Sequence, residues 1–136
     1  MRIFVTGATG FVGRALLARL LRDDHEVELV PRDSGHANLV RALEGSDGVV
    51  NLAGEPLFGR RWNDAYRESL VLSRVSTTQE LVEAIADTRI RPRALVSASA
   101  VGFYGDRGEE ALDEASSGGD GFLPEDVPAD LMAEPT

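Results

Sequence analysis

The chain has 136 residues, of which 43% are hydrophobic and 27% are charged, which is the length and composition of one soluble globular domain. It contains no cysteine, which excludes disulfides, thiolate catalysis and cysteine-based metal sites. No segment approaches the roughly 20 apolar residues of a membrane span, and the N-terminus lacks the pattern of a secretion signal. We therefore expect a cytoplasmic protein with no bound metal and no membrane segment.

The net charge of −9 is concentrated at the end of the chain. Residues 1–106 carry 13 arginines and 14 acidic residues, a net charge of −1, whereas residues 107–136 carry one arginine and nine acidic residues, a net charge of −8. All 14 basic residues are arginine, and they form no basic patch of the kind that binds nucleic acid. Nucleic acid is therefore not an expected partner.

Apolar runs alternate with helical periodicity along the first hundred residues. The sequence predicts, in chain order, a strand at residues 2–6, a helix at 11–22, a strand at 26–31, a helix at 36–44, a strand at 48–53, a helix that Asn63 or Asp64 caps, and a strand at 94–98. The first helix has an apolar stripe at Val12, Leu16, Leu17, Leu20 and Leu21, and the last has one at Val71, Val75, Thr78, Val82 and Ile85.

This alternation indicates an α/β fold, in which a parallel sheet carries helices on both faces and the crossovers are right-handed. Residues 1–106 are expected to form that domain. Residues 107–136 are acidic and rich in Gly, Ser and Pro, so they are expected to form a loop and a disordered tail.

The stretch Thr6-Gly7-Ala8-Thr9-Gly10-Phe11-Val12-Gly13 lies between a predicted strand and a predicted helix. Gly7 would allow a sharp turn off the strand, Gly10 would allow the backbone to approach a pyrophosphate, and Gly13 would allow the helix to pack closely on the sheet. The N–H groups and dipole at the helix start would then hold the anion. The loop therefore predicts dinucleotide binding, although G-x-x-G-x-x-G also occurs in tight turns that bind nothing.

The end of the second strand bears on the choice of cofactor. An arginine there pairs with the 2′-phosphate of NADP, and an acid binds the ribose 2′-hydroxyl of NAD. Arg32 comes first in Pro31-Arg32-Asp33, which favours NADP(H), whereas Asp33 leaves NAD open and a surface Arg–Asp pair is the alternative.

Together with the glycine loop, Asn51-Leu52-Ala53-Gly54-Glu55-Pro56 and the stretch from Ser97 to Asp106 resemble the extended short-chain dehydrogenase/reductase superfamily, in its epimerase-like branch. Arg61-Trp62, Ser73-Arg74 and Thr77-Thr78 strengthen the resemblance to the branch, and the resemblance covers residues 1–123. It implies a Rossmann-type fold and an NAD(P)-dependent oxidoreductase or epimerase that acts on a small carbonyl or sugar-nucleotide substrate.

The resemblance also implies roles for individual residues. Phe11 and Val12 would offer backbone N–H groups to the pyrophosphate, and Asn51, Leu52, Ala53 and Gly54 would line the adenine and ribose side of the cofactor. Ser97 and Ser99 would end the last strand, where Ser99 would hydrogen-bond the reacting oxygen, although strand-end polarity also explains both serines. The mouth of the site would be lined by Arg60, Arg61 and Trp62. The resemblance also implies a homodimer in which the helix at 64–86 forms the interface.

The chain departs from the superfamily in three ways. The usual Tyr-x-x-x-Lys catalytic pair is absent because the chain has no lysine. Only 13 residues separate Asp33 from Asp47, so the sheet is expected to lack one strand and to have about four, in the order 2-1-3-4. Relatives continue for roughly as many residues again, so a truncated sheet is expected.

Two classes of function therefore stay open from the sequence. One is an enzyme that uses Ser99 with a water or an unidentified proton donor. The other is an inactive NADP(H)-binding fragment or an interaction module, and dinucleotide binding is common to both.

Overall fold

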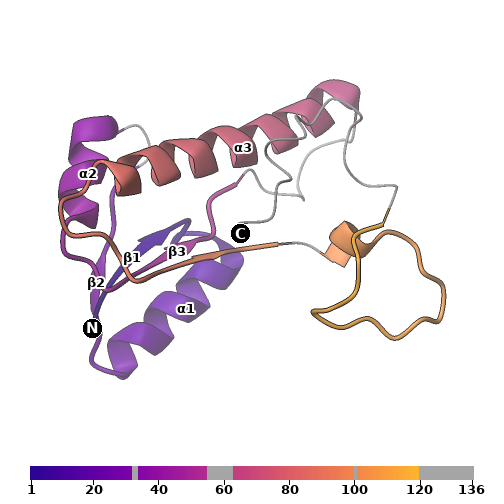
Figure 1. The fold of residues 1–136 in the computed structure, drawn as a ribbon, viewed down its shortest axis with the longest axis horizontal. Helices are drawn as coiled ribbons and strands as arrows, with labels where there is room; N and C mark the ends of the chain where they lie inside the picture. Colours follow the sequence, from indigo (N-terminus) through magenta and orange to yellow (C-terminus); the bar gives the residue numbers. More distant parts are fainter. Residues whose placement is uncertain (32–33, 55–62, 100, 120–136) are drawn as a thin grey trace. The chain divides into compact units, whose positions relative to one another are not determined.

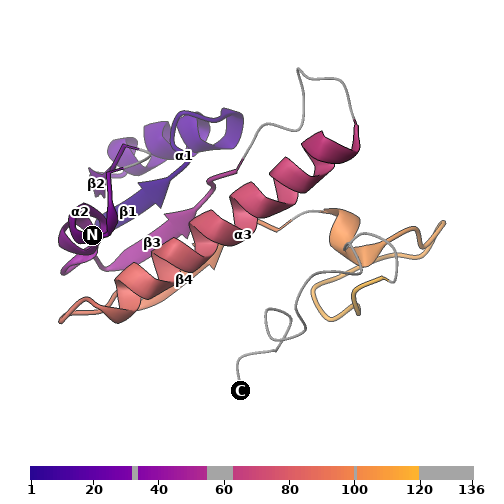
Figure 2. The same ribbon diagram turned by 90° about the horizontal axis from the view of Figure 1, so that it is seen from above.

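Four parallel strands form the sheet of the protein, in a computed structural model that describes residues 1–31, 34–54, 63–99 and 101–119. The strands are β1 (Arg2–Thr6), β2 (Glu26–Glu28), β3 (Gly48–Asn51) and β4 (Ala94–Ser97). They lie side by side in the order β2-β1-β3-β4 (Figure 2), which confirms the strand number and order expected from the sequence. The strands β2, β3 and β4 end one to three residues earlier than predicted.

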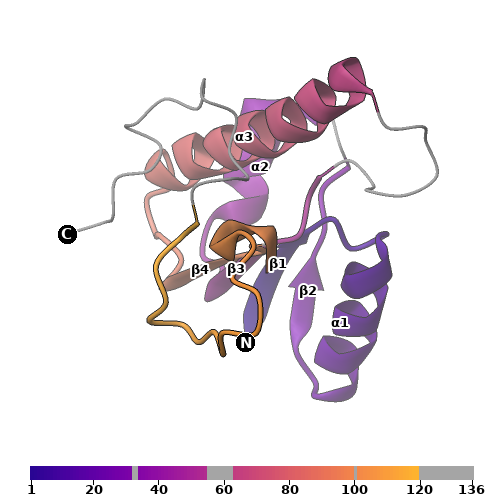
Figure 3. The same cartoon turned by 90° about the vertical axis from the view of Figure 1, so that its right-hand side faces the viewer.

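Three helices cover the two faces of this sheet. Helix α1 (Phe11–Arg22) lies on one face, and α2 (His36–Leu43) and α3 (Asp64–Ala86) lie on the other (Figures 1 and 3). Asn63 caps α3, because its side chain accepts a hydrogen bond from the N–H of Tyr66 at 2.8 Å. This arrangement confirms the Rossmann-type expectation. No helix in the described part of the chain is long and apolar enough to cross a membrane.

The strands place alternate side chains into two apolar cores. Between the sheet and helices α2 and α3, the buried residues are Phe4, Ala42, Leu43, Val49, Leu81 and Ala84. Between the sheet and α1, they are Ile3, Val5 and Ala8, with Leu16, Leu17 and Leu20 packed against them. The sheet is therefore buried on both faces along its central strands, as parallel sheets usually are.

The predicted apolar stripes of the two long helices are partly wrong. On α3, Val82 is 48% exposed, whereas its neighbour Leu81 is 1% exposed. The buried line of α3 runs through Tyr66, Leu70, Leu81 and Ala84, about one residue away from the predicted stripe. One residue is a rotation of about 100° on a helix, and α3 carries apolar residues on both sides of that line.

On α1, Val12 and Leu21 are exposed, and only the three middle leucines of the predicted stripe pack on the sheet. Val12 belongs to the first turn of the helix and Leu21 to the last, so the helix contacts the core through its central turns. The exposure of the first turn matters for the site described below.

A second compact unit begins at Ser99. It begins with a short 3-10 helix, Val101–Tyr104, and the N–H of Gly119 donates to the carbonyl of Phe103 at 2.9 Å. The guanidinium of Arg107 donates to the carbonyl and the hydroxyl of Ser117 and pairs with Glu110. These bonds close residues 103–119 into a loop, and the predicted domain boundary at residue 106 stays a prediction.

The corrected face of α3 makes a direct prediction about stability. Leu81→Ala should lower the free energy of unfolding by about 2–5 kcal/mol, because it opens a cavity among buried side chains. Val82→Ala, on the next residue, should change it by about 0.5 kcal/mol or less, since the side chain is exposed. Urea unfolding of the two variants measures both values. Equal losses, or a larger loss at Val82, would contradict the assignment of the buried face.

Candidate functional site

The carboxyl ends of β1 and β3 lie side by side at the point where the chain reverses its direction across the sheet. From β1 the chain crosses by α1 to β2, and from β2 it returns by α2 on the other face to β3. Open α/β sheets bind their ligands at the carboxyl edge beside such a switch point. The predicted glycine loop follows β1 at this edge, so topology places it where a ligand is expected.

The loop between β1 and α1 is packed against the turn that follows β3. Gly7 has a φ of +69°, and a Cβ on it would lie 2.4 Å from the carbonyl oxygen of Leu52. A Cβ on Gly13 would lie 2.1 Å from the carbonyl oxygen of Gly7. Neither position accepts a side chain without movement of the backbone. Gly10 closes the turn by donating its N–H to the carbonyl of Gly7 at 3.0 Å.

The first turn of α1 is open at this edge of the sheet. Gly10 is the N-cap and supplies no side-chain cap, and the first turn contains no acidic residue. Among the described residues, no hydrogen bond is found to the N–H groups of Phe11, Val12 or Gly13. These donors and the positive end of the helix dipole would suit a phosphate. Phe11 is 88% exposed and Val12 60%, so the turn is accessible.

A row of polar side chains ends the sheet on the face covered by α3. Thr6 pairs with Asn51 in the register of β1 and β3, and Asn51 pairs with Ser97 in the register of β3 and β4. The Asn51 side chain is 3% exposed and makes four hydrogen bonds. Its Oδ1 accepts from the Thr6 hydroxyl at 2.7 Å and from the Ala53 N–H at 3.3 Å. Its Nδ2 donates to the hydroxyls of Thr78 at 3.0 Å and Ser97 at 3.2 Å.

Sequence reasoning missed two members of this row. The sequence predicts Thr6 as the end of the first strand and the start of the glycine loop, and Thr78 as part of the apolar stripe of α3. In the structure both hydroxyls bond to the buried amide of Asn51. A usable signal was present, since a polar residue ends each of three neighbouring strands. The hydrogen bond from Asn51 to Thr78 depends on which face of α3 is turned toward the sheet, and the apolar periodicity predicted that face wrongly.

Arg74 of α3 reaches the turn after β3. A Cβ on Gly54 would lie 3.1 Å from its guanidinium carbon, and Nη1 donates to the carbonyl of Leu70 at 3.0 Å. Gly54 therefore leaves room for the arginine side chain beside the carboxyl edge. This places a cation beside the turn that follows β3, in a chain whose net charge is −9.

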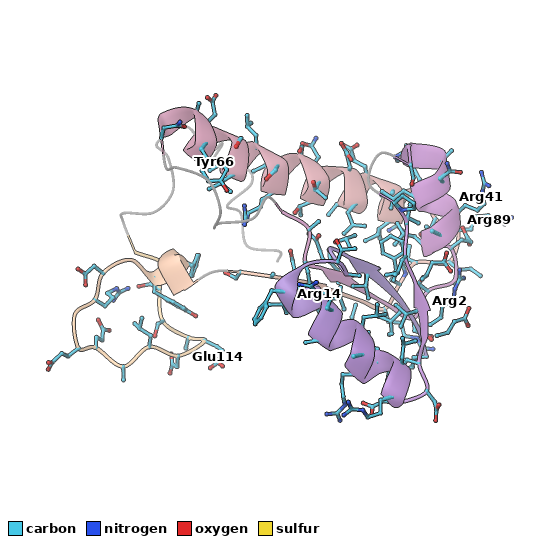
Figure 4. The ribbon with its side chains drawn as sticks, turned by 180° about the vertical axis from the view of Figure 1, so that it is seen from behind. Arg2, Arg14, Arg41, Tyr66, Arg89 and Glu114 are labelled. Carbon is cyan, nitrogen blue, oxygen red and sulfur yellow. The ribbon has the colours of Figure 1, made fainter. Side chains whose placement is uncertain are left out.

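Arginines lie at both edges of the sheet. Arg14, in the first turn of α1, lies at the end of the helix away from Arg2, Arg41 and Arg89 (Figure 4). Arg2 pairs with Glu26 and Glu28, so its charge is balanced locally. Arg14 is exposed, and no ion pair of its side chain is found among the described residues. It can therefore add to the positive potential of the helix start.

The structure brings the predicted residues Gly7, Gly10, Phe11, Val12 and Gly13 together with Asn51, Leu52, Ala53, Gly54 and Ser97. Arg32, Asp33, Arg60, Arg61 and Trp62 lie outside the described residues. Ser99 is exposed and opens the second compact unit. No group of three or more histidines and acidic residues that could hold a metal ion occurs in the described ranges.

Known proteins are similar to this chain over most of its length. The chain is 38% identical to the human epimerase family protein SDR39U1 over 128 residues and 34% identical to a chloroplastic homologue of SDR39U1 from Arabidopsis thaliana over 145 residues. These matches cover 88% and 92% of this chain but 44% and 42% of the relatives. The chain thus spans less than half the length of the curated relatives it matches.

Solved structures match in the same way. The crystal structure of human SDR39U1 with NADPH superposes with a TM-score of 0.78 at 39% identity, covering 88% of this chain and 43% of that chain. A short-chain dehydrogenase/reductase superfamily protein from Agrobacterium tumefaciens with bound NAD superposes with a TM-score of 0.62 at 26% identity, over 85% and 38% of the two chains. Both confirm the resemblance and the fold expected from the sequence.

The family model described as the NAD dependent epimerase/dehydratase family matches residues 3–121, which is most of the chain. With the parallel sheet, the glycine loop at the switch point and these relatives, the chain belongs to the NAD dependent epimerase/dehydratase family.

Proposed function

We propose that this chain binds NADPH at the carboxyl edge of β1 and β3. The observation that carries the proposal is the loop from Gly7 to Gly13, whose glycines are required by backbone contacts and whose helix start offers free N–H groups. An anion of the size of a pyrophosphate would lie against those groups and against the helix dipole. The exposed Arg14 would add electrostatic attraction without occupying the loop.

The preference for NADPH over NADH rests on two independent observations. Arg32 comes four residues after the end of β2, in the stretch of the sequence where an arginine would pair with a 2′-phosphate. The human relative SDR39U1, which is 39% identical to this chain, has a crystal structure with NADPH. Asp33 would favour NAD at the same place. We therefore expect both dinucleotides to bind and NADPH to bind more tightly.

A catalytic role is the second step of the proposal. NADPH, when bound, supplies a hydride to a carbonyl carbon. Ser99 would donate a hydrogen bond to the carbonyl oxygen of a small carbonyl or sugar-nucleotide substrate, which polarises that bond. The family membership and the position of Ser99 just after β4 support this role. Cofactor-dependent turnover that is unchanged in a Ser99→Ala variant would remove Ser99 from the reaction.

The alternative is an NADP(H)-binding chain without turnover, since these 136 residues contain no lysine and therefore no Tyr-x-x-x-Lys pair of their own. Stoichiometric binding with no turnover on a panel of carbonyl compounds would support this alternative. Both functions require the same dinucleotide site.

Calorimetric titration with NADPH and with NADH tests the proposed site. We expect saturable binding of one dinucleotide per chain. A salt bridge between Arg32 and the 2′-phosphate should make NADPH bind about tenfold more tightly, which corresponds to about 1.4 kcal/mol. Absence of binding by a chain that circular dichroism shows to be folded would refute the proposal. Tighter binding of NADH would instead assign the specificity to Asp33.

Two glycine variants test whether NADPH binds at the glycine loop. Gly10→Ala should weaken NADPH at least about tenfold, because the methyl group lies where the pyrophosphate would approach the backbone. Gly10 has a φ of −71°, which alanine adopts readily, and its Cβ would lie 3.2 Å from the Gly7 carbonyl oxygen, so the fold should persist with a shift of a few tenths of an ångström in the loop. Gly48→Ala is the matched control, since its Cβ would meet atoms no closer than 3.7 Å at the opposite edge of the sheet. Equal affinities of the two variants would place the ligand elsewhere.

A further inference from the structure

The hydrogen bonds of Asn51 determine which of its side-chain atoms is oxygen. The N–H of Ala53 is a donor, so the atom 3.3 Å from it must be the acceptor Oδ1, and the Thr6 hydroxyl then donates to the same oxygen. The amide nitrogen therefore faces α3 and β4. With two donors on the oxygen and two acceptors at the nitrogen, all four positions of the buried amide are occupied within the protein.

This orientation also determines how the Ser97 hydroxyl is used. The amide nitrogen of Asn51 can only donate, so the Oγ of Ser97 accepts from it and keeps its own proton for another partner. Ser97 is exposed at the carboxyl end of β4, whereas Asn51 is buried. The proton of Ser97 is thus directed away from the amide and is available at the edge where ligands bind.

Thr78 accepts from the same amide nitrogen at a similar distance, 3.0 Å. It differs from Ser97 in its position, because it lies half-buried on α3 rather than at the end of a strand. The two hydroxyls therefore have the same relation to Asn51 and different access to a ligand. Replacing Thr78 therefore tests the structural role of the Asn51 amide, and replacing Ser97 also tests its role in ligand binding.

We propose that Asn51 is a positioning residue that holds the Ser97 hydroxyl as a hydrogen-bond donor to an acceptor oxygen of the bound dinucleotide. The inference rests on the proposed dinucleotide site. Asn51 itself does not contact the ligand, because its donors and acceptors are already used. It acts by fixing the direction in which Ser97 donates.

Titration of the full chain with NADPH tests the inference through two single variants. Ser97→Ala should raise the dissociation constant about 2- to 10-fold, the effect of losing one hydrogen bond to a ligand. Thr78→Val also removes one partner of Asn51, but it should leave the dissociation constant within about twofold of the wild type. Urea unfolding of both variants shows whether their stabilities differ.

The role of Asn51 requires a third variant and a double-mutant cycle. Asn51→Asp keeps the shape and the accepting oxygen, but its carboxylate accepts where the amide donated. The Ser97 proton then turns toward the carboxylate and is lost to the ligand. The dissociation constant should rise about as much as in Ser97→Ala. Adding Ser97→Ala to Asn51→Asp should then cause no further loss, because the two act through one hydrogen bond.

Each outcome decides between the two proposals. If the folded wild type does not bind NADPH, the proposed function fails before the variants are compared. If the wild type binds and Ser97→Ala binds equally well, or if Thr78→Val weakens binding as much as Ser97→Ala, the positioning role is overturned and the dinucleotide site stands. Fully additive effects of Asn51→Asp and Ser97→Ala on the dissociation constant would also overturn the positioning role. The effect of Asn51→Asp would then come from its added negative charge and not from the Ser97 hydroxyl. The comparison of Ser97→Ala with Thr78→Val remains decisive even if Asn51→Asp does not fold.

Discussion

The close contact between Gly7 and the Leu52 carbonyl is the constraint on which the rest of the site depends. Because a Cβ on Gly7 would lie 2.4 Å from that oxygen, the loop after β1 and the turn after β3 can approach only through glycine. Gly13 lets the first turn of α1 rest on the same loop, with 2.1 Å between its would-be Cβ and the Gly7 carbonyl oxygen. These two contacts direct the start of the helix toward the carboxyl edge. The exposed donors of that turn then follow from the packing of the backbone.

The buried amide of Asn51 connects this edge to the core. It joins the ends of β1, β3 and β4 to α3 through the hydroxyls of Thr6, Ser97 and Thr78. Apolar side chains of the same face, including Phe4 and Val49, lie directly below it in the sheet. A buried polar group is tolerated there because every hydrogen bond of the amide is made. The same amide thus stabilises the end of the sheet and leaves the Ser97 proton exposed.

Much of this architecture could be predicted from the residues. Apolar runs and the change to helical periodicity predicted the four strands and the three α-helices, because these signals are local. The strand order was expected from the resemblance to the superfamily, and the 3-10 helix at Val101–Tyr104 was not predicted. The buried face of α3 could not be predicted, since Leu81 and Val82 are equally apolar and only packing against Leu43 and Phe4 selects between them. The glycine loop was predictable from spacing and flanking elements. The bonds from Asn51 to Thr78 and Ser97 join residues 27 and 46 positions away, and they depend on that same packing.

Backbone amide chemical shifts of the isotope-labelled chain during an NADPH titration would test the central claim most directly. The account predicts that the largest shift changes fall on the amides from Gly7 to Arg14 and from Leu52 to Gly54. It also predicts that amides at the opposite edge, such as Gly48 and Ala94, stay unchanged. Saturable binding with the largest changes at that opposite edge, or with none in the glycine loop, would contradict it.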